Sequence, residues 1–264
     1  MKRFPYMLLL VCILLTSCQM GAASPTATAV PPSDTPAPTD TPLPTDTPTL
    51  VPTSTPDAAA TAAAQATAGA SSVLGELDEL LGDSEVPYKD GHLAWQQSEP
   101  LAITMRGPSG DAATILAIDE SLTAGNFVFK SDVTWEASGW MYCGGVFRSE
   151  ADIERGKQYQ FYFLRFSGLP IWYLDVFENG SEFLSTISKE QTSGDIDMTN
   201  GATNQFVVVA EEEQFTVYFN GNRQGRFFDN SKQRMDGAFG FFGWQESGKG
   251  SCKFDNSWVW SLDQ

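Results

Sequence analysis

The amino-acid sequence predicts an all-β domain, a two-sheet sandwich or a barrel, over residues 83–264. Aromatic residues supply the first observation, because none lies between Tyr6 and Tyr88, and a chain without them cannot build a core there. The second observation comes after residue 127, where short runs of β-branched and aromatic residues are separated by turn dipeptides such as Asn220-Gly221. No long helical period interrupts these runs, a pattern typical of sandwiches and barrels.

Short segments after residue 127 carry the strand pattern. The predicted strands cover residues 127–135, 140–148, 158–166, 170–178, 205–210, 214–219, 238–244 and 251–262. Asn220-Gly221 joins the segment QFTVYF to NRQGRFF and predicts a tight hairpin, since both residues tolerate the positive φ that such turns need.

Residues 1–17 predict an export signal. Lys2 and Arg3 precede a short apolar stretch, and that stretch has about half of the roughly 20 apolar residues that a membrane span needs. The run Leu-Thr-Ser-Cys that ends at Cys18 resembles the bacterial lipoprotein lipobox. The resemblance implies cleavage before Cys18, lipidation of its sulfur and a lipid anchor in a membrane, outside the cytoplasm, at the cell surface or in the periplasm. The alternative is a plain secretory signal that happens to contain a cysteine.

Residues 18–56 predict an extended tether, and residues 57–82 a helical stalk. The tether is rich in Thr and Pro and repeats the tetrapeptide x-Asp-Thr-Pro every six residues, which favours a polyproline-II-like spacer. Asp57 can cap an Ala-rich helix. Beyond it, leucines and Val73 share one helical face that ends at Gly82. We expect this stalk to dock on the domain, and the alternative is a short oligomerisation helix.

The charge of the chain excludes one class of partner. The formal net charge is −17 with a pI near 4.3. Binding to nucleic acid needs clustered Lys and Arg, so we expect no nucleic-acid partner.

Two cysteines remain for the folded domain, Cys143 and Cys252. Exported proteins meet oxidising conditions, so the pair predicts a disulfide between an early and a late strand. Two buried free thiols are the alternative.

Several segments of the domain resemble a known superfamily. They are CGGVFRSE, QFYFLRFSGLPIWYLDVF, NQFVVVAEEEQFTVYFNGNRQGRFFD, GAFGFFGWQ and CKFDNSWVWSL. Together they are similar to the concanavalin A-like jelly roll of the laminin-G and glucanase superfamily, and within it to the branch named 3-keto-disaccharide hydrolase domain. The resemblance covers about residues 93–262 and implies a jelly-roll β-sandwich; its motifs are structural and support the fold more than an activity.

Familiar catalytic signatures are weak in this sequence. His92 is the only histidine, which excludes a multi-histidine metal site or a histidine-dependent triad within the chain. The segment 243–250 lacks the final Ser or Thr of a phosphate loop and precedes a strand. Asp195 and Asp197 alternate like the carboxylates of retaining glucanases, but the flanking Glu is missing and a loop is the better interpretation.

Other acidic residues leave alternatives open. Asp175 with Glu178, or Glu178 with Glu182, could form an acid/base pair, although solvated edge charge is the preferred interpretation. Asp229-Asn230 and Asp255-Asn256 offer oxygen ligands for calcium and equally suit turns. We expect no bound cofactor, with calcium as the alternative.

The seven tryptophans suggest a ligand surface. Flat aromatic faces stack on sugar rings, although most tryptophans in a sandwich pack in the core. Our candidate ligand-facing patch is Trp140, Arg148, Trp172 and Trp244.

Three functions stay open at this stage. The first is a surface-displayed lipoprotein with a non-catalytic glycan-binding or interaction sandwich. The second, implied by the resemblance, is a hydrolase or lyase for modified disaccharides. The third is a structural or sensory ectodomain for a protein partner.

Overall fold

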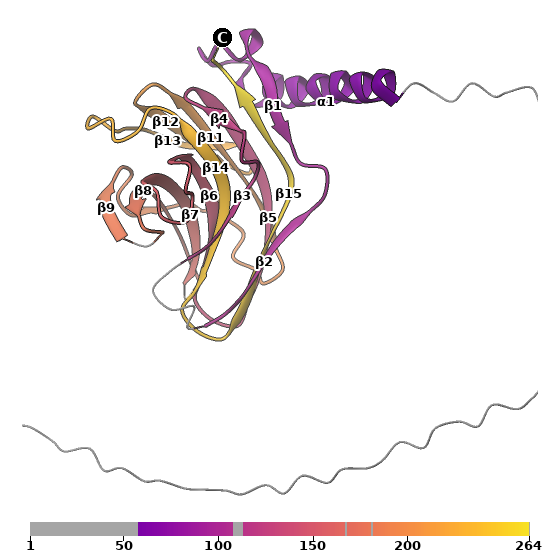
Figure 1. Ribbon diagram of the computed structural model, residues 1–264. Helices are drawn as coiled ribbons and strands as arrows, with labels where there is room; N and C mark the ends of the chain where they lie inside the picture. The colour runs from indigo at the N-terminus through magenta and orange to yellow at the C-terminus, as the bar shows by residue number, and fades with distance from the viewer. Residues whose placement is uncertain (1–57, 108–112, 167, 181, 264) are drawn as a thin grey trace, which may run out of the picture. The chain divides into compact units, whose positions relative to one another are not determined.

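The computed structural model describes residues 58–107, 113–166, 168–180 and 182–263. In these residues two antiparallel sheets stack face to face, and one helix lies on the outside (Figure 1). The predicted jelly-roll β-sandwich is thereby confirmed. The signal, Cys18 and the tether lie outside the described residues. No helix in the described part of the chain is long and apolar enough to cross a membrane.

Sheet A contains seven strands and has the chain termini of the domain at one edge. In spatial order they are β1 (His92–Gln96), β15 (Lys249–Ser261), β5 (Phe127–Ala137), β11 (Thr203–Glu211), β12 (Gln214–Phe219) and β13 (Asn222–Phe228), with β2 (Leu101–Arg106) also paired to β15. The β12–β13 hairpin turns at Asn220 and Gly221, whose φ values are 47° and 79°, as the Asn-Gly signal predicts.

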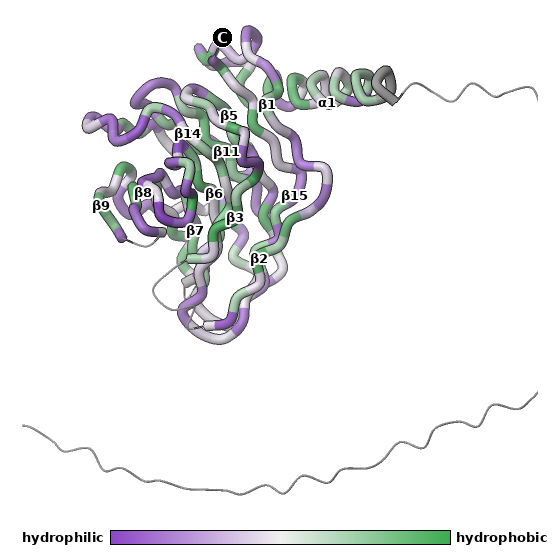
Figure 2. The backbone as a smooth tube through the Cα atoms, in the orientation of Figure 1, coloured by the Kyte–Doolittle hydropathy of each residue, from purple (hydrophilic) through white to green (hydrophobic). Residues whose placement is uncertain are grey.

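Sheet B contains eight strands. In order they are β10 (Gln191–Thr192), β8 (Leu169–Glu178), β7 (Gln158–Phe166), β6 (Met141–Ser149), β14 (Gly237–Gln245) and β3 (Thr114–Ala117), with β4 (Thr123–Ala124) on β14 and β9 (Glu182–Thr186) on β8. The strands carry most of the apolar residues and the connecting loops most of the polar ones (Figure 2).

The core lies between the two sheets and is unusually aromatic. Its fully buried members include Phe127, Phe129, Trp135, Phe161, Phe163, Phe206 and Phe241. Cys143 on β6 and Cys252 on β15 form a disulfide with an S–S distance of 2.03 Å. The predicted disulfide is confirmed, and it links sheet B to sheet A through the core.

Helix α1 (Ala58–Leu81) and the short 3-10 helix η1 (Tyr88–Asp90) cover part of the outer face of sheet A. Val73, Leu77 and Leu81 of α1 are fully buried against the outward side chains of Val207 and Trp258 and their neighbours. Because the apolar positions of α1 recur every four residues, they form one stripe that fits a sheet. The expected docking of the helix on the domain is therefore observed.

A polar contact fixes the position of the helix. Glu76 of α1 accepts a hydrogen bond from Trp258 Nε1 at 3.2 Å and pairs with Lys130 Nζ at 3.1 Å. The Lys130 side chain is only 2% exposed, and Asp132 lies 3.7 Å from its ammonium. A buried ammonium needs such partners, so Glu76 ties the helix to β5 and β15.

Candidate functional site

The outer face of sheet B carries a row of aromatic rings that crosses four adjacent strands. Trp244 of β14, Tyr142 of β6, Tyr162 of β7 and Tyr173 of β8 form this row, which we call the aromatic track. The ring centroids are 4.8 Å apart for Trp244 and Tyr142, 5.5 Å for Tyr142 and Tyr162, and 5.3 Å for Tyr162 and Tyr173. Since neighbouring strands lie about 4.8 Å apart, the rings form a continuous ladder across the sheet.

Strand alternation and register place these rings. On β6 the side chains of Met141, Cys143 and Phe147 enter the core, so Tyr142 points outward. Trp244 pairs directly with Tyr142, and Tyr162 pairs directly with Tyr173. Directly paired residues bring their rings into contact.

Gly144 makes room for the diagonal contact in the middle of the track. It pairs with Tyr162, which leaves the Tyr142 ring as the nearest ring on β6. A Cβ atom on Gly144 would lie 2.7 Å from Phe242 Cε1 and closer still to the carbonyl oxygen of Phe161. A side chain at this position would therefore displace strand β7 and interrupt the track.

Carboxylates hold two of the tyrosines. Tyr162 donates a hydrogen bond from its hydroxyl to Asp175 Oδ2 at 2.7 Å, and Tyr173 donates one to Glu190 Oε2 at 2.9 Å. Asp175 lies two residues after Tyr173 on β8, on the same face of the sheet. The hydroxyl groups therefore have fixed directions before a ligand arrives.

The surroundings shift the acidity of these groups. Burial, together with the hydrogen bond to Glu190 and its charge, raises the pKa of Tyr173 to about 12. Burial also raises the pKa of Tyr162 and that of the Asp175 carboxyl, although hydrogen bonds from Tyr162 and Thr186 oppose the rise at Asp175. The tyrosines stay neutral hydroxyl groups at physiological pH.

A hydrophobic cluster closes one end of this face. Ile115, Val146, Ile153 and Phe242 are buried against one another, and Tyr142 and Tyr162 pack against them. Ile153 belongs to the loop between β6 and β7. The aromatic track is thus the partly exposed border of a packed surface, which keeps its rings rigid.

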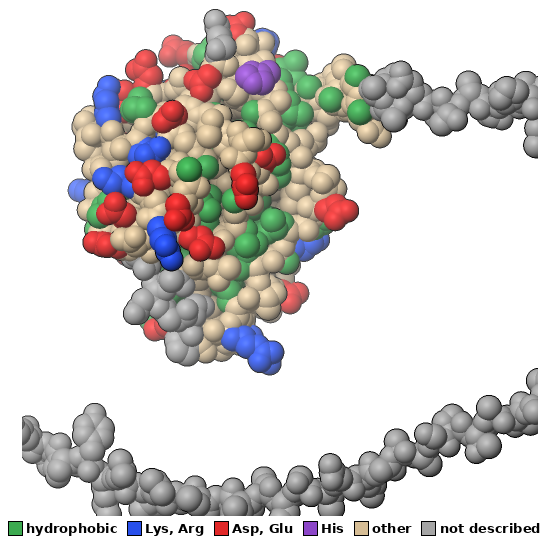
Figure 3. All heavy atoms as spheres, in the orientation of Figure 1, with side chains coloured by type: hydrophobic (Ala, Val, Ile, Leu, Met, Phe, Trp, Pro, Cys, Tyr) green, Lys and Arg blue, Asp and Glu red, His purple; other side chains and the backbone are tan. Residues whose placement is uncertain are grey.

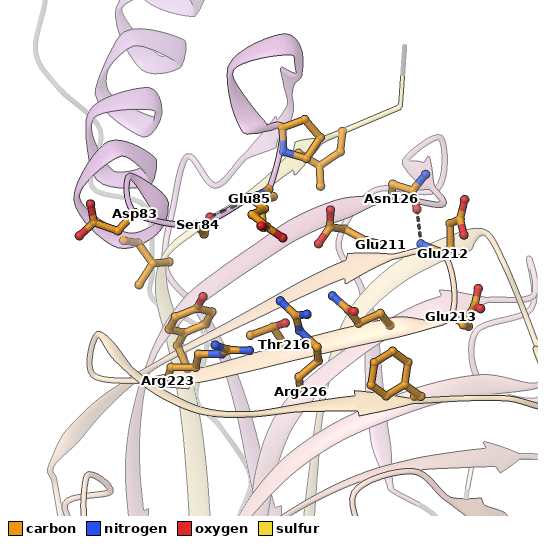
Figure 4. A pocket seen from close by; sticks show the side chains of 17 residues that line it. Asp83, Ser84, Glu85, Asn126, Glu211, Glu212, Glu213, Thr216, Arg223 and Arg226 are labelled. Atoms are coloured by element: carbon orange, nitrogen blue, oxygen red, sulfur yellow. Dashed lines mark hydrogen bonds between the residues drawn. The ribbon is translucent and has the colours of Figure 1, made fainter.

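A hollow lies beside sheet A, away from the aromatic track, between the end of α1 and the free edge of that sheet (Figure 4). Its volume is about 920 Å³. Asp83 and Glu85 form one wall, and Arg223 and Arg226 rise from β13 opposite them. Burial raises the pKa of the nearby Glu211 carboxyl, Arg226 opposes that rise and Glu85 adds to it. Carboxylates outnumber guanidinium groups around this groove, and it lacks a row of rings.

The structure separates the four residues of the predicted ligand patch. Trp244 lies on the aromatic track and is partly exposed. Trp140 is 38% exposed and lines a different hollow of about 450 Å³ with Arg165 and Met198. Trp172 is 1% exposed and packs against Phe161 and Phe219 in the core.

Arg148 also lies in the interior, with no exposed surface. Its guanidinium donates two hydrogen bonds to the carbonyl oxygen of Gly125, at 2.9 and 2.7 Å, and faces the rings of Phe127 and Phe215. The expectation that Arg148 and Trp172 face a ligand is therefore corrected. Both side chains point between the sheets, where the arginine satisfies backbone carbonyls and the tryptophan fills the core.

The acidic candidates also have definite places. Asp175 is 2% exposed, so solvated edge charge was the wrong interpretation for this residue, whereas Glu178 and Glu182 face each other across β8 and β9. Asp195 lies in a loop, as predicted, and accepts hydrogen bonds from Asn222 and Gln224 that fix this loop to β13.

The two aspartates proposed for calcium have partners within the protein. The Asp229 carboxylate accepts hydrogen bonds from Tyr159 and from the backbone of Gln233. Asp255 pairs with Lys253 at 3.1 Å. Among the described residues, no group of three or more His, Cys, Asp or Glu side chains is arranged to hold a metal ion.

Sequence reasoning missed Tyr142, Tyr162, Tyr173 and Glu190. The strands QFYFLRF and IWYLDVF carry large apolar residues at nearly every position, so period-two alternation is hidden. A usable signal was the type of aromatic residue: the Phe residues at 161 and 163 face the core, and the tyrosine between them turns its hydroxyl outward. Tyr159, which lies in the core, shows that this signal has exceptions.

Comparison with known proteins gives similarity to solved structures only. The chain matches no protein-family model and no curated protein sequence. The carbohydrate-binding module CBM66 from Bacillus subtilis is 21% identical over 61% of this chain and 92% of that chain, with a TM-score of 0.45. The β-glucanase of Bacillus licheniformis is 9% identical, over 62% of this chain and 79% of that chain, with a TM-score of 0.43.

A third similar structure is the laminarinase catalytic domain from Thermotoga maritima. It is 8% identical over 64% of this chain and 80% of that chain, with a TM-score of 0.45. Identities and TM-scores this low do not assign a function to the chain, so a function must be argued from the geometry of the aromatic track.

Proposed function

We propose that this protein is a lipid-anchored lipoprotein displayed outside the cytoplasm, and that its sandwich binds a glycan on the aromatic track. The observation that carries the binding proposal is the ladder of four rings on four adjacent strands, with hydroxyl groups oriented by carboxylates. Sugar rings have an apolar face and a rim of hydroxyls. A partly exposed ladder of stacked rings offers apolar contact to that face, and the oriented polar groups beside it offer partners to the hydroxyls.

The lipid anchor rests on the lipobox resemblance at Cys18. A lipid at the N-terminus and a Thr/Pro-rich spacer would hold the sandwich away from the membrane. Metabolic labelling with a fatty-acid analogue tests this part: incorporation should be lost in the variant Cys18→Ser, and labelling of that variant at the wild-type level would refute the anchor.

The binding proposal is tested with a glycan panel and single substitutions in the full chain. Trp244→Ala and Tyr142→Ala should each weaken binding about fivefold, because each removes one aromatic contact worth roughly 1 kcal/mol. Phe228→Ala is the matched control, since Phe228 is 51% exposed but lies on β13 of sheet A. Equal losses in the control and the track variants would refute the track as the site.

A second candidate function is hydrolysis of modified disaccharides, which the family resemblance implies. One observation favours it: burial raises the pKa of Asp175, a property of general acids. Asp175 touches the track through Tyr162. In this case Asp175→Asn would abolish cleavage of a bound sugar while leaving its affinity within about threefold, whereas a binding module would show no cleavage in either form.

A further inference from the structure

At the Tyr162–Tyr173 end of the aromatic track, both hydroxyl protons are already engaged in hydrogen bonds within the protein. Tyr162 donates its hydroxyl hydrogen bond to Asp175, and Tyr173 donates its own to Glu190. A tyrosine hydroxyl has one proton and two acceptor positions. At this end of the track, the tyrosine oxygens and the Glu190 carboxylate can therefore only accept hydrogen bonds from a ligand.

The charges that act on the track are negative. Glu246 acts on Tyr142, Asp175 on Tyr162, and Glu190 and Asp175 on Tyr173. Each of these interactions raises the pKa of the tyrosine concerned, which is the effect of a neighbouring anion. At Tyr218, beside the other hollow, Arg223 and Arg226 act in the opposite direction.

The whole surface reinforces this local field. The chain has 33 acidic and 16 basic residues, and acidic side chains outnumber basic ones on the face shown in Figure 3. A sugar bearing a carboxylate or a sulfate would approach against this field. At the Tyr162–Tyr173 end, the acidic oxygens of such a sugar would face the acceptor oxygens of the protein. Neither set could then form a hydrogen bond with the other.

We infer that the aromatic track is selective for sugars that donate hydrogen bonds at its Tyr162–Tyr173 end, so that amino sugars bind most tightly, neutral sugars bind, and acidic sugars are rejected. This inference rests on the proposed function, because it concerns the ligand of the same site. Tyr173 and Glu190 set the preference: a protonated amino group there would gain a charge-assisted hydrogen bond that a hydroxyl cannot match.

A panel of polysaccharides of different charge tests the inference on the full chain. It contains chitosan as the amino sugar, neutral glucans and fructans, alginate and polygalacturonate as uronates, and heparin as a sulfated sugar. Binding of chitosan more tightly than of the neutral sugars, without binding of the acidic ones, supports the inference. Neutral sugars that bind as tightly as chitosan overturn the preference for amino sugars. Binding of the acidic sugars as tight as that of neutral ones overturns the inference but leaves glycan binding intact. If no sugar binds, both proposals fall.

A second measurement locates the preference in the structure. Glu190→Gln should reduce the ratio of chitosan affinity to neutral-glycan affinity about two- to fivefold, because it removes one partly solvated charge interaction. Glu212→Gln, an exposed glutamate on the far sheet, is the matched control and should leave the ratio unchanged. An unchanged ratio in Glu190→Gln, or an equal change in the control, would overturn the assignment to Glu190.

Discussion

The outer faces of the two sheets both carry aromatic side chains, but these side chains are buried on sheet A and partly exposed on sheet B. The outer face of sheet A presents Trp258 and Trp260 on β15, and both are buried beneath α1 or its flanking residues. The outer face of sheet B presents Tyr142, Tyr162 and Trp244, which remain partly exposed. An aromatic-rich sheet face is therefore a helix-docking surface on one side and an open surface on the other, and the difference is what the chain places over it.

The contacts on the two faces differ in kind. Under α1, the aliphatic side chains of the helix pack on the sheet, and the ion pair of Glu76 with the buried Lys130 ties the helix to β5. On sheet B, the rings stack on one another and their hydroxyls are oriented by carboxylates. The covered face contributes buried apolar area to the fold, whereas the open face leaves its ring ladder partly exposed to solvent.

The largest effect on stability should come from removing the disulfide that links the two sheets. Replacing both cysteines, Cys143→Ser with Cys252→Ser, removes a link across a sequence separation of 109 residues. The chain-entropy argument gives a loss of about 4–5 kcal/mol in the free energy of unfolding. Denaturant unfolding of the oxidised wild type and the double variant measures the loss, and a difference below about 1 kcal/mol would contradict it.

Truncation on each face should separate stability from binding. Leu77→Ala removes a fully buried side chain under α1 and should cost about 2–4 kcal/mol of stability while leaving glycan affinity unchanged. Tyr142→Ala, on the open face, should cost less stability and should weaken glycan binding about fivefold. Thermal unfolding and binding of the two variants are compared directly; a loss of glycan binding in folded Leu77→Ala would contradict the division of roles.

The ion pair under α1 should respond differently to the loss of each partner. Glu76→Gln leaves the buried ammonium of Lys130 with only Asp132 at 3.7 Å, and we expect a loss of about 1–2 kcal/mol because the pair is partly solvated on the Glu76 side. Lys130→Met removes the buried charge itself and should be close to neutral. Equal destabilisation in both variants would show that packing, and not charge, fixes the helix.

The smallest effect concerns the pH dependence set by Asp175 on the open face. Burial raises the pKa of its carboxyl above the ordinary value of 3.8. A raised folded-state pKa means that the folded protein binds the proton more tightly, so this group's contribution to stability is complete below pH 3.8 and is lost as the pH rises through the raised pKa.

Asp175→Asn should therefore flatten the fall in stability above pH 4, as measured by chemical denaturation across the acidic range. Asp119→Asn is the control of opposite sign, because hydrogen bonds from Ser121 lower the pKa of Asp119. Loss of that carboxylate should reduce stability above pH 4. The same pH profile in wild type and Asp175→Asn would contradict the raised pKa.

Much of the fold could be predicted from the sequence. The turn at Asn220-Gly221, the disulfide of Cys143 with Cys252 and most strands of residues 127–262 follow from local patterns. The sequence pattern did not predict strands β1, β2 and β3, because they are short and lie before residue 127, where the aromatic alternation begins. The docking of α1 was expected from its leucine stripe, and the structure chose it over the alternative of an oligomerisation helix.

The candidate site could be predicted only in part. Trp244, a predicted ligand-facing residue, is partly exposed on sheet B. On β8 the sequence pointed to Trp172, which enters the core, whereas Tyr173, one residue further on, joins the track. Strands packed on both faces carry large residues at every position, and so the sequence does not say which set faces outward.

The sequence by itself predicted an acidic all-β sandwich that contains one disulfide. It also predicted an amphipathic helix before the sandwich. These properties depend on composition, turn chemistry and short-range periodicity. The tertiary structure decided which aromatic residues meet. Strand register aligned Trp244, Tyr142, Tyr162 and Tyr173 across four strands, and helix docking withdrew Trp258 and Trp260 from the surface. These contacts depend on pairing between segments that are far apart in the sequence, and local sequence patterns do not encode such pairing.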